Sequence, residues 1–126
     1  MLYSIYGMNH QRIRWKRLKP QVLKVLGHPV RLQILSALAE GEECVCHLTA
    51  MLGLRQAYVS QQLAILRRAG LVLDRRDGLN IYYRISDPRV RELLGLLENV
   101  VEIPKEVRRR IAGCPCPKCQ VALVGA

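Results

Sequence analysis

The chain places all five of its cysteines in two short clusters. Cys44 and Cys46 stand in the run EECVCHL, and Cys114, Cys116 and Cys119 stand in the run GCPCPKC. In a reducing compartment, clustered cysteines serve as metal ligands or redox sensors more often than as structural disulfides. A soft ion takes roughly three or four thiolates, so the first cluster alone falls short of a complete site. We therefore expect one shared site; the alternative is a sensor at the first cluster and a structural zinc in the second.

The spacing of Cys44 and Cys46 restricts how the two thiols can bind one ion. On an ideal α-helix, residues i and i+2 lie about 200° apart, so their side chains point away from each other. The thiols converge only where the backbone is extended or distorted, at or before a helix start. We expect metal binding to distort the first turn of a helix here. The alternative is that one cysteine belongs to the core and the other is incidental.

The ligand type restricts the ion and the chemistry. Sulfur ligation disfavours calcium, magnesium and manganese, and the lack of an obvious histidine set in the sequence disfavours nickel and cobalt. Arsenite and antimonite bind about three thiolates, and cadmium, lead and zinc bind about three or four. A rival hypothesis is that the cysteine pairs sense persulfide or oxidant by forming a sulfur bridge. The sequence has no nucleophile–base pair with an orienting acid and no phosphate loop, so we expect no enzyme.

The charge of the chain indicates an acidic partner. Among 126 residues, 20 are Lys or Arg and 10 are Asp or Glu, which gives a formal net charge of +10. This balance favours nucleic acid first and an anionic membrane surface second. No apolar run approaches the roughly 18 residues of a membrane span. The charges at the start are not ordered as in a secretory signal, so we expect a cytoplasmic protein.

Short helices followed by a hairpin are predicted along the middle of the chain. Four apolar segments with helical periodicity end at Gly27, Gly41, Gly53 and Gly70. The pattern changes in LVLDRRDGLNIYYRIS, where Asp-Gly between two strand-like runs predicts a two-residue turn at Asp77-Gly78.

A last helix is predicted from Asp87, the N-cap, with Pro88 in its first position. Its apolar residues form one stripe between Val90 and Val101. This stripe is larger than a thin domain can cover, which favours a dimer. We expect a basic N-terminal arm at residues 1–19, a DNA-binding and dimerisation domain at residues 20–103, and a cysteine-rich tail at residues 104–126.

This order of elements is typical of a winged helix-turn-helix. We predict a mainly α fold with a small β-hairpin, active as a dimer. When Val59, Leu63 and Leu66 of the predicted recognition helix face inward, Gln61 points outward, where it can pair with adenine. Other outward or wing residues suited to DNA are Ala57, Ser60, Arg67, Arg68, Arg75 and Arg76.

Several runs resemble the ArsR/SmtB family of bacterial metal-responsive repressors: HPVRLQILSAL, ECVCHLTAMLGL, YVSQQLAILRRAGLVLDRRDGLNIYYRI and DPRVRELL. The resemblance implies a homodimeric winged-helix repressor that binds operator DNA without metal and releases it when metal binds. The family commonly has a serine cap where this chain has Arg55, which cannot accept the N–H bonds of a cap. We expect Arg55 to contact phosphate instead. The DNA contacts that the resemblance implies are Gln56, Tyr58, Ser60, Gln61, Arg75 and Arg76.

The CVC run resembles the metal-sensing box of the same family, whose members complete the site with cysteines from a terminal segment. This resemblance implies As(III) or Sb(III) as the first candidates for the inducer and cadmium, lead or zinc as the second. In place of an aspartate of the box the chain has His47, which we expect at the surface, with metal ligation as the alternative. On the last helix, Arg89 stands where the family's second common metal site has a ligand, so we predict that this site is absent.

Overall fold

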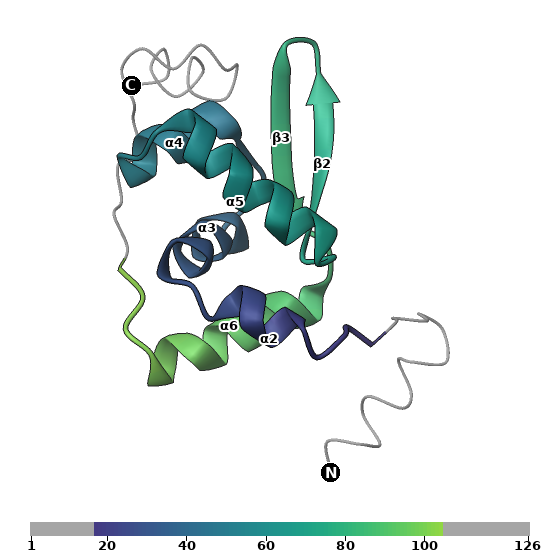
Figure 1. The fold of residues 1–126 in the computed structure, drawn as a ribbon, viewed down its shortest axis with the longest axis vertical. Coiled ribbons are helices and arrows are strands. Elements are labelled where there is room, and N and C mark those ends of the chain that lie inside the picture. Colours follow the sequence, from purple (N-terminus) through teal and green to yellow (C-terminus); the bar gives the residue numbers. More distant parts are fainter. Residues whose placement is uncertain (1–16, 105–126) are drawn as a thin grey trace.

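A computed structural model describes residues 17–104 of the chain (Figure 1). The predicted tail ligands Cys114, Cys116 and Cys119, and most of the predicted basic arm, lie outside the described residues. The described part is mainly helical with one small sheet, as predicted. Its elements are α2 (Val22–Leu26), α3 (Pro29–Ala39), β1 (Glu43–Cys44), α4 (Val45–Leu52), α5 (Gln56–Arg68), β2 (Val72–Asp77), β3 (Asn80–Ile85) and α6 (Pro88–Val100).

The sheet has three antiparallel strands in the order β1-β3-β2, where the sequence predicted only the β2–β3 hairpin. The additional strand β1 consists of Glu43 and Cys44, which pair with Tyr83 and Tyr82 of β3. Two residues are too few to show the alternating pattern that identifies a strand in a sequence. The hairpin extends beyond the helices at the end of the molecule opposite α2 and α6 (Figure 1).

The hairpin turn lies one residue later than predicted. Asp77 pairs with Asn80 in the β2–β3 ladder, so the turn residues are Gly78 and Leu79 rather than Asp77 and Gly78. Gly78 has a φ of 61°, a left-handed conformation that glycine adopts without strain. The side chain of Leu79 is fully exposed at the tip of the wing.

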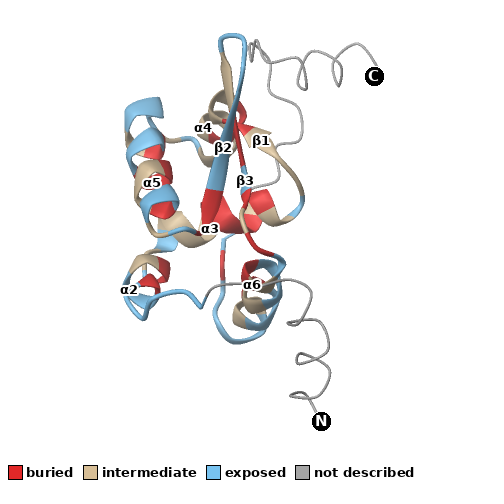
Figure 2. Ribbon diagram, turned by 90° about the vertical axis from the view of Figure 1, so that its right-hand side faces the viewer, coloured by how far each residue is buried: buried red, intermediate tan, exposed pale blue. Residues whose placement is uncertain are grey.

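The core is built from aliphatic side chains of α3, α5 and the lower part of the hairpin (Figure 2). The predicted inward face of α5 is confirmed, because Val59, Leu63 and Leu66 are completely buried. They pack in one cluster with Ile34 and Leu38 of α3. This cluster fixes the orientation of α5, so the opposite face of that helix is available to solvent.

Helix α6 begins as predicted, with Asp87 as its N-cap. The Asp87 carboxylate accepts a hydrogen bond from the backbone N–H of Arg89 at 2.8 Å and pairs with the Arg89 guanidinium at 2.6 Å. The side-chain hydrogen bond from Arg89 lowers the pKa of Asp87 below its ordinary value. Val90 and Leu94 are buried within the protomer, whereas Leu96 and Val100 are exposed. The apolar stripe of α6 is therefore only partly covered within one chain.

Within residues 17–104, no helix is long and apolar enough to cross a membrane.

Candidate nucleic-acid interface and cysteine pair

Helices α4 and α5 form the predicted helix-turn-helix. Helix α4 ends at Gly53, which has a left-handed φ of 65° and donates its backbone N–H to the carbonyl of Thr49. The chain then turns and enters α5 at Gln56, after Arg55 in an extended conformation. The Arg55 side chain makes no capping hydrogen bond, which agrees with the expectation that arginine cannot serve as a cap.

The exposed face of α5 carries the residues that the sequence suggests for DNA reading. Arg55, Gln56, Ser60 and Gln61 are exposed, and Tyr58 is half-buried. Short polar side chains at the N-terminal half of such a helix allow it to enter the major groove. Arg67 and Arg68 lie exposed at the C-terminal end.

The two wing arginines have different surroundings. Arg76 is exposed. Arg75 forms a two-point contact with the Glu42 carboxylate, with Nη2 at 2.6 Å from Oε1 and Nε at 3.2 Å from Oε2. Its guanidinium also lies 4.7 Å from the centre of the Tyr82 ring, and its Nη1 lies 3.9 Å from Asp77. The hydrogen bond with Glu42 raises the pKa of Arg75 further above its ordinary value.

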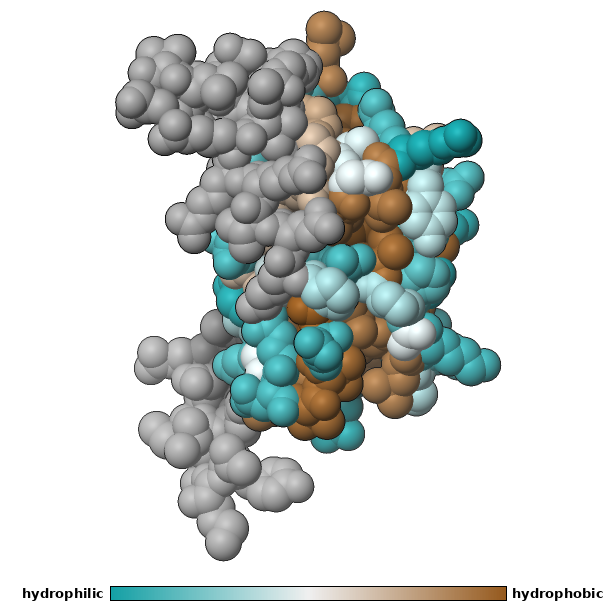
Figure 3. All heavy atoms as spheres, turned by 90° about the vertical axis from the view of Figure 1, so that its left-hand side faces the viewer, coloured by the Kyte–Doolittle hydropathy of each residue, from teal (hydrophilic) through white to brown (hydrophobic). Residues whose placement is uncertain are grey.

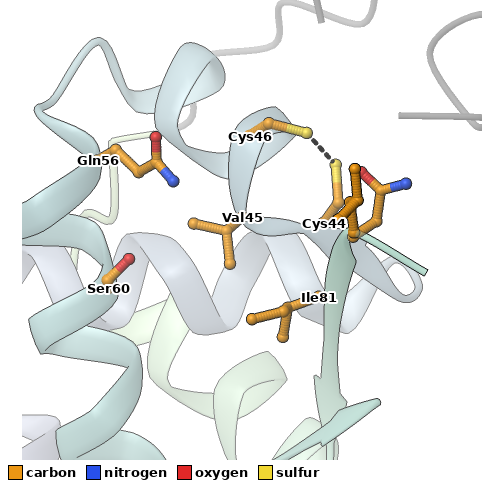
Figure 4. A pocket seen from close by; sticks show the side chains of 8 residues that line it. Cys44, Val45, Cys46, Gln56, Ser60 and Ile81 are labelled. Atoms are coloured by element: carbon orange, nitrogen blue, oxygen red, sulfur yellow. Dashed lines mark hydrogen bonds between the residues drawn. The ribbon is translucent and has the colours of Figure 1, made fainter. Parts of the chain in front are cut away.

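The thiols of Cys44 and Cys46 face each other, with their Sγ atoms 2.7 Å apart (Figure 4). Cys44 is not part of the helix: it is the extended N-cap of α4, with a ψ of 157°, and its sulfur accepts a hydrogen bond from the backbone N–H of His47. The thiols therefore converge at an extended helix start, one of the two arrangements that their spacing allows. The distortion of the first helical turn by a bound metal stays a prediction. Pairing of Cys44 with Tyr82 already holds the backbone extended, so the angular separation of an ideal helix does not apply.

His47 is buried, so the expectation of a surface residue is wrong. Its Nε2 lies 3.6 Å from Oε2 of Glu43, four residues earlier, and both side chains are largely inaccessible to solvent. Because α4 follows β1 directly, His47 faces the strand rather than solvent. Within the described residues, Cys44 and Cys46 belong to no group of three or more acidic, histidine or cysteine side chains that could hold a metal ion.

A pocket of about 350 Å³ lies between the cysteine pair, the start of α5 and the wing. Figure 4 shows Gln56 and Ser60 of α5 on one side of this pocket and the two thiols at its far end. A ligand on the thiols would thus lie close to side chains suggested for DNA reading. The lining residues are Cys44, Val45, Cys46, Gln56, Ser60, Leu79, Asn80 and Ile81.

Two residues that the sequence reasoning did not select hold the recognition helix in place. Gln62 is buried, and its Oε1 accepts a hydrogen bond from Nε of Arg31 at 2.8 Å. Arg31 also donates to the carbonyl of Val25 at 3.3 Å, so it links α5 to α3 and to the end of α2. A signal was present in the sequence, because Gln62 stands three residues after the buried Val59 and thus near the inward face.

The helix-turn-helix, the exposed polar face of its second helix and the antiparallel wing define a winged helix-turn-helix DNA-binding protein. The family model described as the bacterial regulatory protein, arsR family, matches residues 28–73. The biofilm growth-associated repressor of Agrobacterium fabrum is 41% identical over 85 residues, which cover 68% of this chain and 73% of the relative. The chain belongs to the ArsR family and is a DNA-binding transcriptional regulator, not an enzyme.

Two further similarities support this assignment. The arsenic resistance transcriptional regulator ArsR1 of Pseudomonas putida is 40% identical over 88 residues, covering 69% of each chain. The homodimeric winged helix-turn-helix DNA-binding domain Mb0332 of Mycobacterium bovis superposes with a TM-score of 0.60 at 39% identity. That similarity covers 64% of this chain and 74% of the Mycobacterium bovis chain.

Proposed function

We propose that the protein is a cytoplasmic homodimeric repressor that binds operator DNA and releases it when a thiophilic metal(loid) binds its cysteines. The observation that carries the proposal is the pair of facing thiols, 2.7 Å apart, beside the start of the recognition helix. Two converging sulfurs suit a soft ion, and their position next to α5 gives the ion a route to influence DNA binding.

The DNA-binding part of the proposal rests on the surface of α5 and on charge. Gln56, Tyr58, Ser60 and Gln61 are the base-reading candidates, and Arg55, Arg75 and Arg76 are the phosphate candidates. A formal net charge of +10 favours association with a polyanion. Two copies of α5 placed about 34 Å apart would read successive major grooves of one operator.

The dimer is supported by exposed apolar side chains on elements at one end of the molecule. Leu96 and Val100 of α6 are 66% and 84% exposed, and Leu23 of α2 is 69% exposed. Figure 3 shows apolar side chains at the lower end of the face it presents, where Figure 1 places the C-terminal part of α6. Packing this surface against a second copy would remove it from water. The homodimeric domain from Mycobacterium bovis has the same fold.

The inducer that fits best is As(III) or Sb(III), with cadmium, lead or zinc as alternatives. Cys44 and Cys46 supply two thiolates, and a soft ion takes roughly three or four. We infer that the third thiolate comes from Cys114, Cys116 or Cys119, of the same or the other subunit. The name of the Pseudomonas putida relative, an arsenic resistance regulator, supports arsenic as the first ion to test.

The test is a titration of the reduced full-length protein with arsenite, followed by thiolate–metal ultraviolet absorption. In parallel, the release of a fluorescent operator, selected from random duplexes, is followed by anisotropy. Cys46→Ser should bind DNA like the wild type and no longer release it. Replacing the three tail cysteines by serine should lower arsenite affinity sharply. If that variant still binds arsenite tightly and still releases DNA, the tail is not part of the sensing site.

A second candidate function is the sensing of persulfide or peroxide, which the short distance between the two sulfurs favours. Oxidation by peroxide would join the sulfurs, reduce the peroxide to water and transfer the two thiol protons to it. Mass spectrometry after peroxide or persulfide treatment separates the two functions. A mass change that accompanies DNA release, without tight metal binding by the reduced protein, would favour this alternative.

A further inference from the structure

We propose that Glu42 competes with DNA phosphate for Arg75, so that the segment preceding the cysteine pair controls one DNA contact of the wing. The proposal has two parts. The competition for Arg75 concerns DNA binding alone. The control of that competition by a ligand on Cys44 and Cys46 rests on the proposed function.

In the Glu42–Arg75 pair, the carboxylate occupies the position on the guanidinium that a DNA phosphate would use. Arg75 uses Nε and Nη2, one edge of its guanidinium, to contact the two Glu42 oxygens at 3.2 and 2.6 Å. A phosphate group is recognised by the same two-point arrangement. The Arg75 guanidinium also lies over the Tyr82 ring, a cation–π contact that favours its position on the wing. A phosphate that uses this edge must therefore displace Glu42.

The Glu42–Arg75 pair contributes little to folding. The Arg75 side chain is 50% exposed and that of Glu42 is 30% exposed. Ion pairs at such exposed positions are screened by solvent and salt, and their effect on stability is small. The main effect of the ion pair is therefore on the availability of Arg75 for other anions, such as DNA phosphate. Removing the Glu42 charge should leave the fold unchanged and make Arg75 more available.

The same segment connects Arg75 to the cysteine pair. Glu42 immediately precedes β1, and Cys44 of β1 pairs with Tyr82 of β3. On the other edge of β3, Tyr82 pairs with Arg75 of β2. Tyr82 thus lies between Cys44 and Arg75 in the sheet. An ion that binds both thiolates at about 2.3 Å with a tetrahedral angle holds the two sulfurs about 3.8 Å apart. The sulfurs of Cys44 and Cys46 are 2.7 Å apart, so such an ion would shift β1 relative to α4 and, with it, the Glu42 carboxylate.

The first experiment compares Glu42→Gln with Glu40→Gln in the full-length protein without inducer. Both substitutions remove one negative charge, but within the described residues Arg75 pairs with Glu42 and Asp77 and not with Glu40. We expect Glu42→Gln to tighten operator binding about two- to fivefold more than Glu40→Gln, the range expected for releasing an exposed ion pair. In an Arg75→Ala background, the two substitutions should have the same effect. Urea unfolding checks that both variants remain folded.

Two results would overturn the competition. One is equal operator affinity of Glu42→Gln and Glu40→Gln. The other is weaker binding by Glu42→Gln than by Glu40→Gln, which would mean that Glu42 holds Arg75 in a productive position.

The second experiment repeats the operator titrations with saturating arsenite. Glu42→Gln should bind arsenite as tightly as the wild type, and the ratio of operator affinities without and with arsenite should be smaller than in the wild type. An unchanged ratio would refute the control by the cysteine pair. If arsenite has no effect on the wild type, the proposed inducer is wrong, and the first experiment still decides whether Glu42 competes for Arg75.

Discussion

Gln61 and Gln62 are neighbours on α5 with opposite surroundings, so one substitution made at each position separates DNA reading from folding. Gln61 is exposed on the face suggested for the major groove. Gln62 is 6% exposed and accepts a hydrogen bond from Arg31 at 2.8 Å. We expect alanine at position 61 to change operator discrimination and alanine at position 62 to change stability.

The magnitudes follow from the two contacts. Gln62→Ala removes a hydrogen bond to a charged group, worth about 1.5–3 kcal/mol, and leaves Arg31 with one partner fewer. The higher helix propensity of alanine returns a few tenths of a kcal/mol. We therefore expect the free energy of unfolding to fall by about 1–3 kcal/mol. Gln61→Ala should change it by less than about 0.5 kcal/mol, and should reduce discrimination between operators by about 1–3 kcal/mol.

Urea unfolding at one fixed protein concentration measures the stabilities, since a dimer unfolds in a concentration-dependent manner. Anisotropy titrations with the selected operator and with single-base variants measure the discrimination. The reasoning is refuted if Gln62→Ala is as stable as the wild type, or if Gln61→Ala binds all duplexes with the wild-type pattern.

Three further expectations concern the dimer, the wing and the α6 cap. Leu96→Glu should convert the proposed dimer to a folded monomer in analytical ultracentrifugation. Leu94→Glu should instead unfold the chain, because Leu94 is buried within the protomer. A Leu96→Glu variant that dimerises with unchanged affinity would contradict the proposed interface. Arg76→Ala should weaken binding to all duplexes alike and lower the salt dependence by about one unit per subunit; a change confined to one operator would argue for base reading instead. In the wild type, the side-chain hydrogen bond from Arg89 lowers the pKa of Asp87. Asp87→Asn keeps the cap but loses this ion pair. Because the pKa of Asp87 is lowered on folding, its ionised form stabilises the fold at a pH above the ordinary pKa of 3.8. This contribution is lost as the pH falls through the folded-state pKa. The wild type should therefore exceed Asp87→Asn in free energy of unfolding by up to about 1 kcal/mol at neutral pH, and this difference should disappear in acid. A difference that does not change with pH would contradict the role of the Asp87–Arg89 pair.

The fold could be predicted from the sequence because its signals are local. Periodic leucines, the glycines that end helices and the Asp87-Pro88 start of α6 each depend on neighbouring residues, and the structure confirms them. The outward face of α5 followed from the same periodicity. The turn position was missed by one residue because the pairing of Asp77 with Asn80 extends the ladder.

The cysteine geometry could not be predicted because it depends on a contact between distant segments. Strand β1 is too short to show a pattern, and only its pairing with β3 makes Cys44 extended and turns its thiol toward Cys46. The burial of His47 and the Glu42–Arg75 contact have the same origin, since each follows from the position of the segment at residues 42–47 against the wing. Sequence periodicity carries no information about such a contact.

The central claim is that ligand binding at the cysteines and operator binding oppose each other through one protein. The most direct test measures four dissociation constants on the reduced full-length protein: operator with and without arsenite, and arsenite with and without operator. Linkage requires that both pairs differ by the same factor, which we expect to lie between about 5 and 150, and that Cys46→Ser abolishes the difference. Arsenite that binds tightly while the operator affinity stays unchanged would contradict the claim.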